Sequence, residues 1–134
     1  MIEGGCNCGA IRYKIESNPV VVAQCHCKNC QRQSGSAFSV NLMVPVAGVT
    51  TTGELTTYED RDTRSGNPVY RRFCGNCGSP IFSDLAEDNG MTIVKAGTLD
   101  DPTPFKPVVS VWTSTKMPWV DLPEGQRGFP ENAG

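Results

Sequence analysis

The chain has 134 residues, about the length of one domain, with 12 basic and 14 acidic side chains and a formal net charge of −2. This balance, with a pI of about 5.3, argues against a general nucleic-acid binder. No apolar run approaches the roughly 18 residues that a membrane helix needs, and the opening MIEGGCNCGA does not resemble a signal peptide. We therefore expect a single cytoplasmic domain over residues 1–134, with no nucleic-acid or membrane partner.

Short segments rich in valine and threonine, separated by turn signals, predict strands along most of the chain. In the first of them, 10–16, Ile11, Tyr13 and Ile15 alternate with charged residues, which is typical of a strand with one buried face. Further strands are predicted at 20–24, 38–44, 49–52, 55–58, 69–73, 81–82, 91–95 and 108–112. The sequence therefore favours an all-β fold.

The rest of the chain is predicted to form turns, loops and one short helix. The helix covers 28–34 and ends at Gly35, a residue suited to a left-handed C-terminal cap. A polar loop is predicted at 60–68, and Asn89-Gly90 favours a tight turn into the strand at 91–95. The tail from about residue 123 is rich in Pro, Gly, Glu and Asn, and we expect less order there.

Seven cysteines fall into three clusters: a C-x-C at Cys6 and Cys8, a C-x-C-x-x-C at Cys25, Cys27 and Cys30, and a C-x-x-C at Cys74 and Cys77. In a reducing compartment, cysteines at such short spacing indicate metal ligands or catalytic thiols rather than disulfides. Two thiolates this close can share one Zn²⁺, and a tetrathiolate site also accepts iron. The clusters therefore predict bound metal, with zinc favoured.

Seven thiolates divide naturally into four and three. Four close a tetrahedral structural site, whereas three leave one coordination position free, which is how catalytic zinc is usually held. Two other interpretations stay open: a single four-thiolate site with three ordinary buried cysteines, or a redox switch built on a vicinal disulfide.

Spacing alone suggests one way of pairing the clusters. Cys8 and Cys27 are separated by 18 residues, close to the usual distance between two knuckles of a ribbon-type zinc site, whereas Cys30 and Cys74 are separated by 43. On this argument Cys6 and Cys8 would share a metal with Cys27 and Cys30.

The three cysteine segments also carry a resemblance to a known family. GGCNCGAIRY, CHCKNCQRQSGSAF and FCGNCGSPIF, in this order, resemble the glutathione-dependent formaldehyde-activating enzyme family, which also contains centromere protein V. The later VWTSTKMPW resembles the family's closing Trp-containing segment. The resemblance runs from Gly4 to about Pro123.

The resemblance implies a fold and a division of the cysteines. The fold is a β-tent of antiparallel sheets, stapled by a structural zinc on Cys6, Cys8, Cys74 and Cys77. A second, catalytic zinc would be held by Cys25, Cys27 and Cys30. This pairing contradicts the one from spacing, and we follow the resemblance. The family often has a His just before an Ile/Val-Trp/Phe pair in its last segment, where this chain has Ser110 before Val111-Trp112, so altered activity is one expectation.

Several residues near the middle motif are candidate substrate contacts. By resemblance the QRQSGSAF stretch lines the site, which nominates Gln31, Ser34 and Phe38. Lys28 and Arg32 are candidates for attracting an anionic thiol, with solvated surface charge as the alternative. His26, the one histidine of the chain, is expected to point away from Cys25 and Cys27 because neighbouring side chains alternate in an extended segment. A structural role is therefore favoured over a ligand role.

The resemblance, together with a set of three thiolates that leaves one position free, implies a zinc-dependent carbon–sulfur lyase or synthase. It would form or cleave the adduct of a glutathione-like thiol with formaldehyde or a related small aldehyde, using two zinc ions per chain. The alternatives are a non-catalytic zinc-binding interaction module and a thiol or metal sensor. The sequence does not indicate an oligomeric state.

Overall fold

The computed structural model describes residues 1–63, 65–86 and 89–132. In these residues most regular structure is strand, with one α-helix and three short 3₁₀ helices. The elements, in chain order, are β1 (Ile2–Gly5), β2 (Arg12–Ile15), β3 (Val21–Cys25), α1 (Lys28–Ser34), β4 (Ser39–Pro45), η1 (Val46–Gly48), β5 (Val49–Thr52), β6 (Leu55–Asp60), β7 (Val69–Cys74), β8 (Pro80–Leu85), β9 (Met91–Lys95), η2 (Ala96–Thr98), β10 (Val109–Val111), η3 (Thr113–Thr115) and β11 (Arg127–Gly128). The expected all-β fold with one short helix after the middle cysteine motif is confirmed.

The described strands form two sheets. The smaller has the order β1-β2-β5, and the larger has the order β11-β10-β3-β4-β9-β8-β7-β6. All neighbours are antiparallel except β10, which runs parallel to both β3 and β11. This departs from the wholly antiparallel expectation, because β10 reaches the free edge of β3 through a long connection rather than a hairpin.

The core lies between the two sheets. Ile11, Tyr13 and Ile15 are at most 1% exposed, as their alternation with charged residues predicts. They belong to one cluster with a row of residues across the larger sheet, in which Val22 pairs with Leu42, Leu42 with Val94 and Val94 with Phe82. The Tyr13 and Phe82 rings lie 5.3 Å apart at their centroids.

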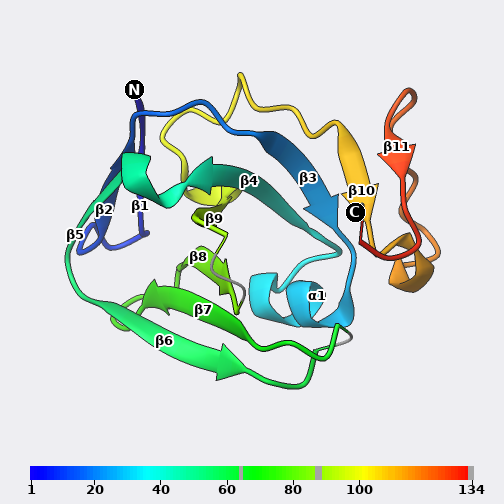
Figure 1. Ribbon diagram of the computed structural model, residues 1–134, viewed down its shortest axis with the longest axis horizontal. Coiled ribbons are helices and arrows are strands. Elements are labelled where there is room, and N and C mark those ends of the chain that lie inside the picture. The colour runs from blue at the N-terminus through cyan, green and yellow to red at the C-terminus, as the bar shows by residue number, and fades with distance from the viewer. Residues whose placement is uncertain (64, 87–88, 133–134) are drawn as a thin grey trace.

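The opposite face of the larger sheet is concave. Figure 1 shows this sheet curling from β3 and β4 through β9 and β8 to β7 and β6, with α1 at the open side between the two arms. Side chains alternate along each strand, so every buried core residue of β3, β4 and β9 has neighbours that face this second side. The curl brings residues of β3 and β7 to opposite walls of one pocket.

The predicted strands match the observed ones closely, and two strands were missed. β1 contains Gly4 and Gly5, which have low strand propensity. β11 has only two residues and lies in the segment from about residue 123. The observed helix α1 has the predicted bounds, and Gly35 caps its C-terminus with a φ of 64°. No helix in the described residues is long and apolar enough to span a membrane.

Two candidate metal centres and a shared pocket

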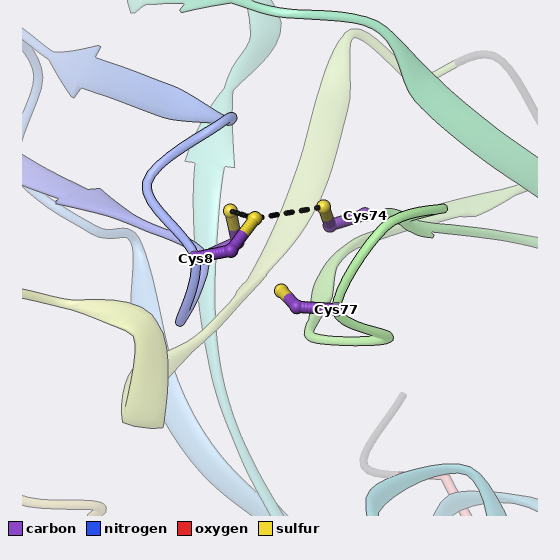
Figure 2. Close-up of side chains that lie close together, drawn as sticks. Cys8, Cys74 and Cys77 are labelled. Atoms are coloured by element: carbon purple, nitrogen blue, oxygen red, sulfur yellow. Dashed lines mark hydrogen bonds between the residues drawn. The ribbon is translucent and has the colours of Figure 1, made fainter.

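The first candidate centre joins two turns that are far apart in the sequence. Cys6 and Cys8 lie in the β1–β2 turn, Cys74 is the last residue of β7, and Cys77 lies in the β7–β8 turn. The Sγ atom of Cys8 is 3.6 Å from that of Cys6 and 3.7 Å from that of Cys74. All four Sγ atoms lie within 4.8 Å of one another. Figure 2 shows Cys8 facing Cys74 and Cys77 from the opposite turn. We call these four residues the quartet.

Local hydrogen bonds favour the charged form of two quartet sulfurs, those of Cys6 and Cys77. The backbone N–H of Ile11 donates to the Cys6 Sγ at 3.2 Å. The hydroxyl of Ser79 lies 3.2 Å from the Cys77 Sγ and, with its own backbone N–H, lowers the pKa of Cys77 to about 5. Gly78 adopts a φ of 80°, which lets the chain turn back after the second knuckle.

The second candidate centre is built where β3 runs into α1. Cys25 ends β3, Cys27 is the N-cap of α1, and Cys30 lies in its first turn. The Cys27 Sγ accepts a hydrogen bond from the Cys30 backbone N–H at 3.2 Å, and the Cys25 and Cys30 Sγ atoms are 3.2 Å apart. We call these three residues the trio. The short helix therefore folds the C-x-C-x-x-C motif so that its sulfurs converge.

Both sets of donors fit a soft metal ion. The Sγ atoms of each set lie close enough together to share one ion, and thiolates select zinc or iron. Among the described residues no histidine or carboxylate joins either set. The quartet offers a complete tetrahedral set, and the trio offers three donors. The structure thus groups the cysteines as the resemblance implies. The grouping from spacing was wrong, because Cys74 lies beside Cys8 across the two sheets although it is distant in sequence.

The trio opens into a pocket of about 470 Å³ on the concave face of the larger sheet. Cys25, Cys27 and Cys30 all line it, together with Trp112 from the end of β10. Trp112 has a φ of 57°, which is unusual for a large side chain. The trio is therefore accessible to a small molecule, whereas the quartet lies in the two turns and lines neither this pocket nor its smaller neighbour.

A buried lysine faces the trio in this pocket. Lys95, at the end of β9, is 6% exposed, and its Nζ donates to the Asn41 Oδ1 at 3.1 Å. Burial lowers the pKa of Lys95, while the negative charge of Cys30 acts in the opposite direction. Hydrogen bonds from Cys25 and Cys27 lower the pKa of Cys30 to about 2, and the positive charge of Lys95 also lowers it.

A second buried cation in the pocket is already paired. Arg71 is 4% exposed, and its Nε donates to the Asp60 Oδ2 at 2.8 Å. Although burial alone would lower it, the Asp60 carboxylate raises the pKa of Arg71. Both carboxylate oxygens of Asp60 also accept hydrogen bonds from the Asn29 Nδ2, which places the Asp60–Arg71 pair against α1. Lys95, in contrast, has no carboxylate partner among the described residues.

His26 follows the last residue of β3 and does not line the trio's pocket. It is fully buried, its ring packs 5.2 Å from the Phe38 ring, and its Nε2 is 3.3 Å from the Ser110 Oγ. Burial lowers the pKa of His26, so the neutral form is favoured. The Ser110 hydroxyl lies within hydrogen-bond distance of the side-chain oxygens of Gln24 and Gln126, and the Gln126 Nε2 donates to the Gln24 Oε1 at 2.7 Å. Ser110 therefore belongs to a buried polar network rather than to the pocket.

The predicted substrate contacts divide into three groups. Lys28 and Arg32 are exposed on α1 and are not among the residues that line the trio's pocket. Gln31 is buried, and its Nε2 donates to the backbone oxygens of His26 and Thr115 at 2.8 and 3.0 Å. Ser34 and Phe38 line a neighbouring pocket that also contains Lys95. The surface cations that the sequence suggested thus lie outside the trio's pocket, and Gln31 anchors the helix.

Sequence reasoning missed the polar residues that accompany the trio, namely Lys95, Asn41 and Arg71. One signal was available for Lys95, a charged residue that shares a strand face with Ile93 in the predicted strand at 91–95. The alternation could not show which sheet face was hollow or which strand lay beside Cys25, because strand order is set by long-range pairing.

Comparisons with known proteins identify relatives of this chain. The family model for the glutathione-dependent formaldehyde-activating enzyme matches residues 1–115. A Halomonas elongata protein named "Putative glutathione-dependent formaldehyde-activating enzyme" is 24% identical over 99% of this chain and 91% of its own. Proteins of the same name from Penicillium rubens and Phaeosphaeria nodorum are 28% and 24% identical over 63% and 95% of this chain. The match covers only 44% and 64% of their own lengths.

A solved structure has the same fold. The crystal structure of a Rhodobacter sphaeroides protein aligns with a TM-score of 0.56 at 16% identity, covering 95% of this chain and 98% of that chain.

Proposed function

The chain belongs to the glutathione-dependent formaldehyde-activating enzyme family, and from this premise we propose that it is a zinc-dependent carbon–sulfur lyase or synthase. Its substrates are a glutathione-like thiol and formaldehyde or a related small aldehyde. The observation that carries the proposal is the trio: three convergent thiols that line a pocket large enough for a thiol substrate. A purely structural metal would have no need of such access.

Zinc held by Cys25, Cys27 and Cys30 would favour the thiolate form of a bound thiol substrate. The thiolate is the nucleophilic form of sulfur. The overall reaction adds the thiol across the aldehyde: the sulfur bonds to the carbonyl carbon, the π electrons move to oxygen, and the proton lost by sulfur ends on that oxygen. Cleavage is the reverse.

The residues of the pocket contribute charge balance and position. Three thiolates and an incoming fourth concentrate negative charge in a largely buried space, and the Lys95 ammonium is the nearby cation without a carboxylate partner among the described residues. Asn41 accepts from its Nζ and so fixes the end of the side chain. Lys95 therefore stabilises the anionic sulfur, and Trp112 closes one wall of the pocket.

The quartet would hold a second zinc with a structural role. A metal there ties the β1–β2 turn to the β7–β8 turn, closing a loop from Cys8 to Cys74. We also propose that residues 1–134 act as one domain in the cytoplasm, where the thiols needed for metal binding stay reduced.

The proposal is tested by the rate of adduct formation with protein of known metal content. Glutathione and formaldehyde are mixed with the zinc-loaded protein, with its Cys27→Ser variant and without protein, and S-hydroxymethylglutathione is followed by NMR. We expect two zinc ions per chain and faster formation than in buffer for the wild type. The Cys27→Ser variant should retain one zinc and lose the acceleration.

Two outcomes would contradict the proposal. If both zinc ions are present and the adduct forms no faster than in buffer, the chain is better described as a non-catalytic zinc module. If the wild type accelerates the reaction but Cys27→Ser accelerates it equally, the activity does not depend on the trio.

A further inference from the structure

The pocket of the trio contains an apolar surface that addition to formaldehyde does not use. It is formed by five half-buried side chains on neighbouring strands of the larger sheet: Val21, Ala23, Met43, Ile93 and Val109. We call these residues the apolar strip. Their chain neighbours Val22, Leu42 and Val94 face the core on the opposite side of the same sheet, so the strip is a separate surface and not part of the core.

The register of the strands places the strip beside the trio. Val109 pairs with Ala23, which is two residues before Cys25 on the same face of β3. The next row on that face joins Val21 to Met43 and Met43 to Ile93. Because two residues of a strand span roughly 6.6 Å, the first row lies about that far from Cys25 and the second about twice as far.

Two polar residues of the pocket, Asn41 and Lys95, lie in the row that is nearer to the trio. Asn41 and Lys95 occupy the same row as Ala23, through the pairs Ala23–Asn41 and Asn41–Lys95. The cation therefore lies at the side of the strip that is nearer to the trio. A ligand with an apolar substituent on its sulfur matches this order, with the sulfur at the trio and the substituent toward Met43 and Ile93.

A largely apolar wall with a few placed polar groups is the usual form of a site for a small organic ligand. Formaldehyde has no carbon beyond its carbonyl, so it would leave the strip in contact with water. We infer that the strip binds the substituent of a larger aldehyde, such as an alkyl or aryl group of about six carbons, after that aldehyde is joined to the thiol. This inference rests on the proposed function and specifies its aldehyde.

Thioethers of glutathione test the strip without catalysis. They carry an alkyl group on the same sulfur as the adduct does and cannot react further. Binding of S-hexylglutathione and S-methylglutathione to the zinc-loaded protein is measured by titration calorimetry. We expect the hexyl compound to bind at least tenfold more tightly, because the additional methylenes are removed from water.

Variants of two neighbouring residues locate the effect. Val109→Thr changes a residue of the strip and keeps its shape, whereas Val108→Thr changes the preceding residue, which is 60% exposed and does not line the pocket. Met43→Gln is a second strip variant of similar length. We expect both strip variants to reduce the hexyl preference to under threefold and Val108→Thr to keep it. Zinc content and thermal unfolding confirm that each variant is folded.

Several outcomes would overturn the inference. These are a hexyl preference below threefold in the wild type, no binding of either thioether, or a preference that both strip variants retain. Rates with glutathione and either hexanal or formaldehyde separate this inference from the proposed function. Acceleration with formaldehyde but not with hexanal contradicts the strip and keeps the function. Acceleration with neither aldehyde contradicts the function, while the thioether titration still decides whether the strip binds an apolar group.

Discussion

The side-chain amide of Asn29 donates to both carboxylate oxygens of Asp60, at 3.1 and 3.0 Å, and so ties the helix of the trio to β6. Asp60 also pairs with the buried Arg71. We predict that Asp60→Asn destabilises the protein by about 3–5 kcal/mol, because it leaves the Arg71 charge buried without a partner. Urea unfolding of the zinc-loaded protein measures the change.

The adjacent residue supplies the control. Glu59 pairs with Arg61 at 2.9 Å, and the side chain of Arg61 is 78% exposed. Such surface pairs contribute about 0–1 kcal/mol, so Glu59→Gln should leave the unfolding midpoint almost unchanged. A similar small effect for Asp60→Asn would show that the Asp60–Arg71 pair does not stabilise the fold.

The quartet and the trio should respond differently to loss of one cysteine. Structural zinc sites contribute on the order of 10 kcal/mol or more of apparent binding free energy, so Cys74→Ser is expected to unfold the protein. Cys27→Ser should remove one zinc and leave the fold largely intact, since Cys27 lies at the edge of a pocket. Circular dichroism and metal analysis of both variants measure the difference, and equal damage from both would show that the two centres have the same role.

Close packing around Gly4 provides a test of the β1–β2 pairing. A Cβ at this position would overlap the Tyr13 hydroxyl and the Thr98 carbonyl oxygen, whereas a Cβ at Gly97 would meet nothing within 4 Å. Gly4→Ala should therefore cost about 1–3 kcal/mol of unfolding free energy, as overpacking usually does. Gly97→Ala should be neutral within about 0.5 kcal/mol. If the two variants unfold at the same urea concentration, the approach of β1 to Tyr13 is looser than the structure indicates.

This close approach also shows what the sequence could and could not predict. The alternation around Tyr13 predicted its strand and its buried face, because a period of two is local information. β1 was not predicted, because Gly4 and Gly5 have low strand propensity. Gly4 allows close contact with Tyr13 and Thr98, which local sequence does not reveal. Pairing of Cys8 with Cys74 was likewise beyond local spacing, and only the resemblance to a family supplied it.

The buried phenol of Tyr13 predicts a loss of stability at high pH. Its hydroxyl is 2.7 Å from the Thr98 Oγ1, and burial raises the pKa of Tyr13 to about 12 from an ordinary value of 10.0. Between these values the unfolded chain releases the proton first, so the unfolded state is favoured as pH rises. The contribution, on the order of 2 kcal/mol, is present below pH 10 and is lost between about pH 10 and 12.

The Tyr13→Phe variant isolates this effect. It cannot ionise at this position, so the difference in unfolding free energy between wild type and variant should shrink or reverse across that range. A difference that stays constant from pH 9 to 12 would mean that the Tyr13 phenol has an ordinary pKa in the folded protein.

Lys95 gives a prediction in which stability and activity separate. A buried charge without a carboxylate partner is costly to the fold, so replacing it by an apolar side chain of similar length is expected to be neutral or stabilising. If its ammonium stabilises the anionic sulfur at the trio, the same change should lower kcat/KM for adduct formation by tenfold or more. We therefore predict that Lys95→Met has an unchanged or higher Tm and a much lower rate.

Lys28, which lies in the cysteine motif but is exposed on α1, is the matched control, and Lys28→Met should change neither Tm nor rate. A Lys95→Met protein with normal kinetics would show that the trio needs no neighbouring cation, and a loss of rate in Lys28→Met would return the role of substrate attraction to the surface residue that the sequence first suggested.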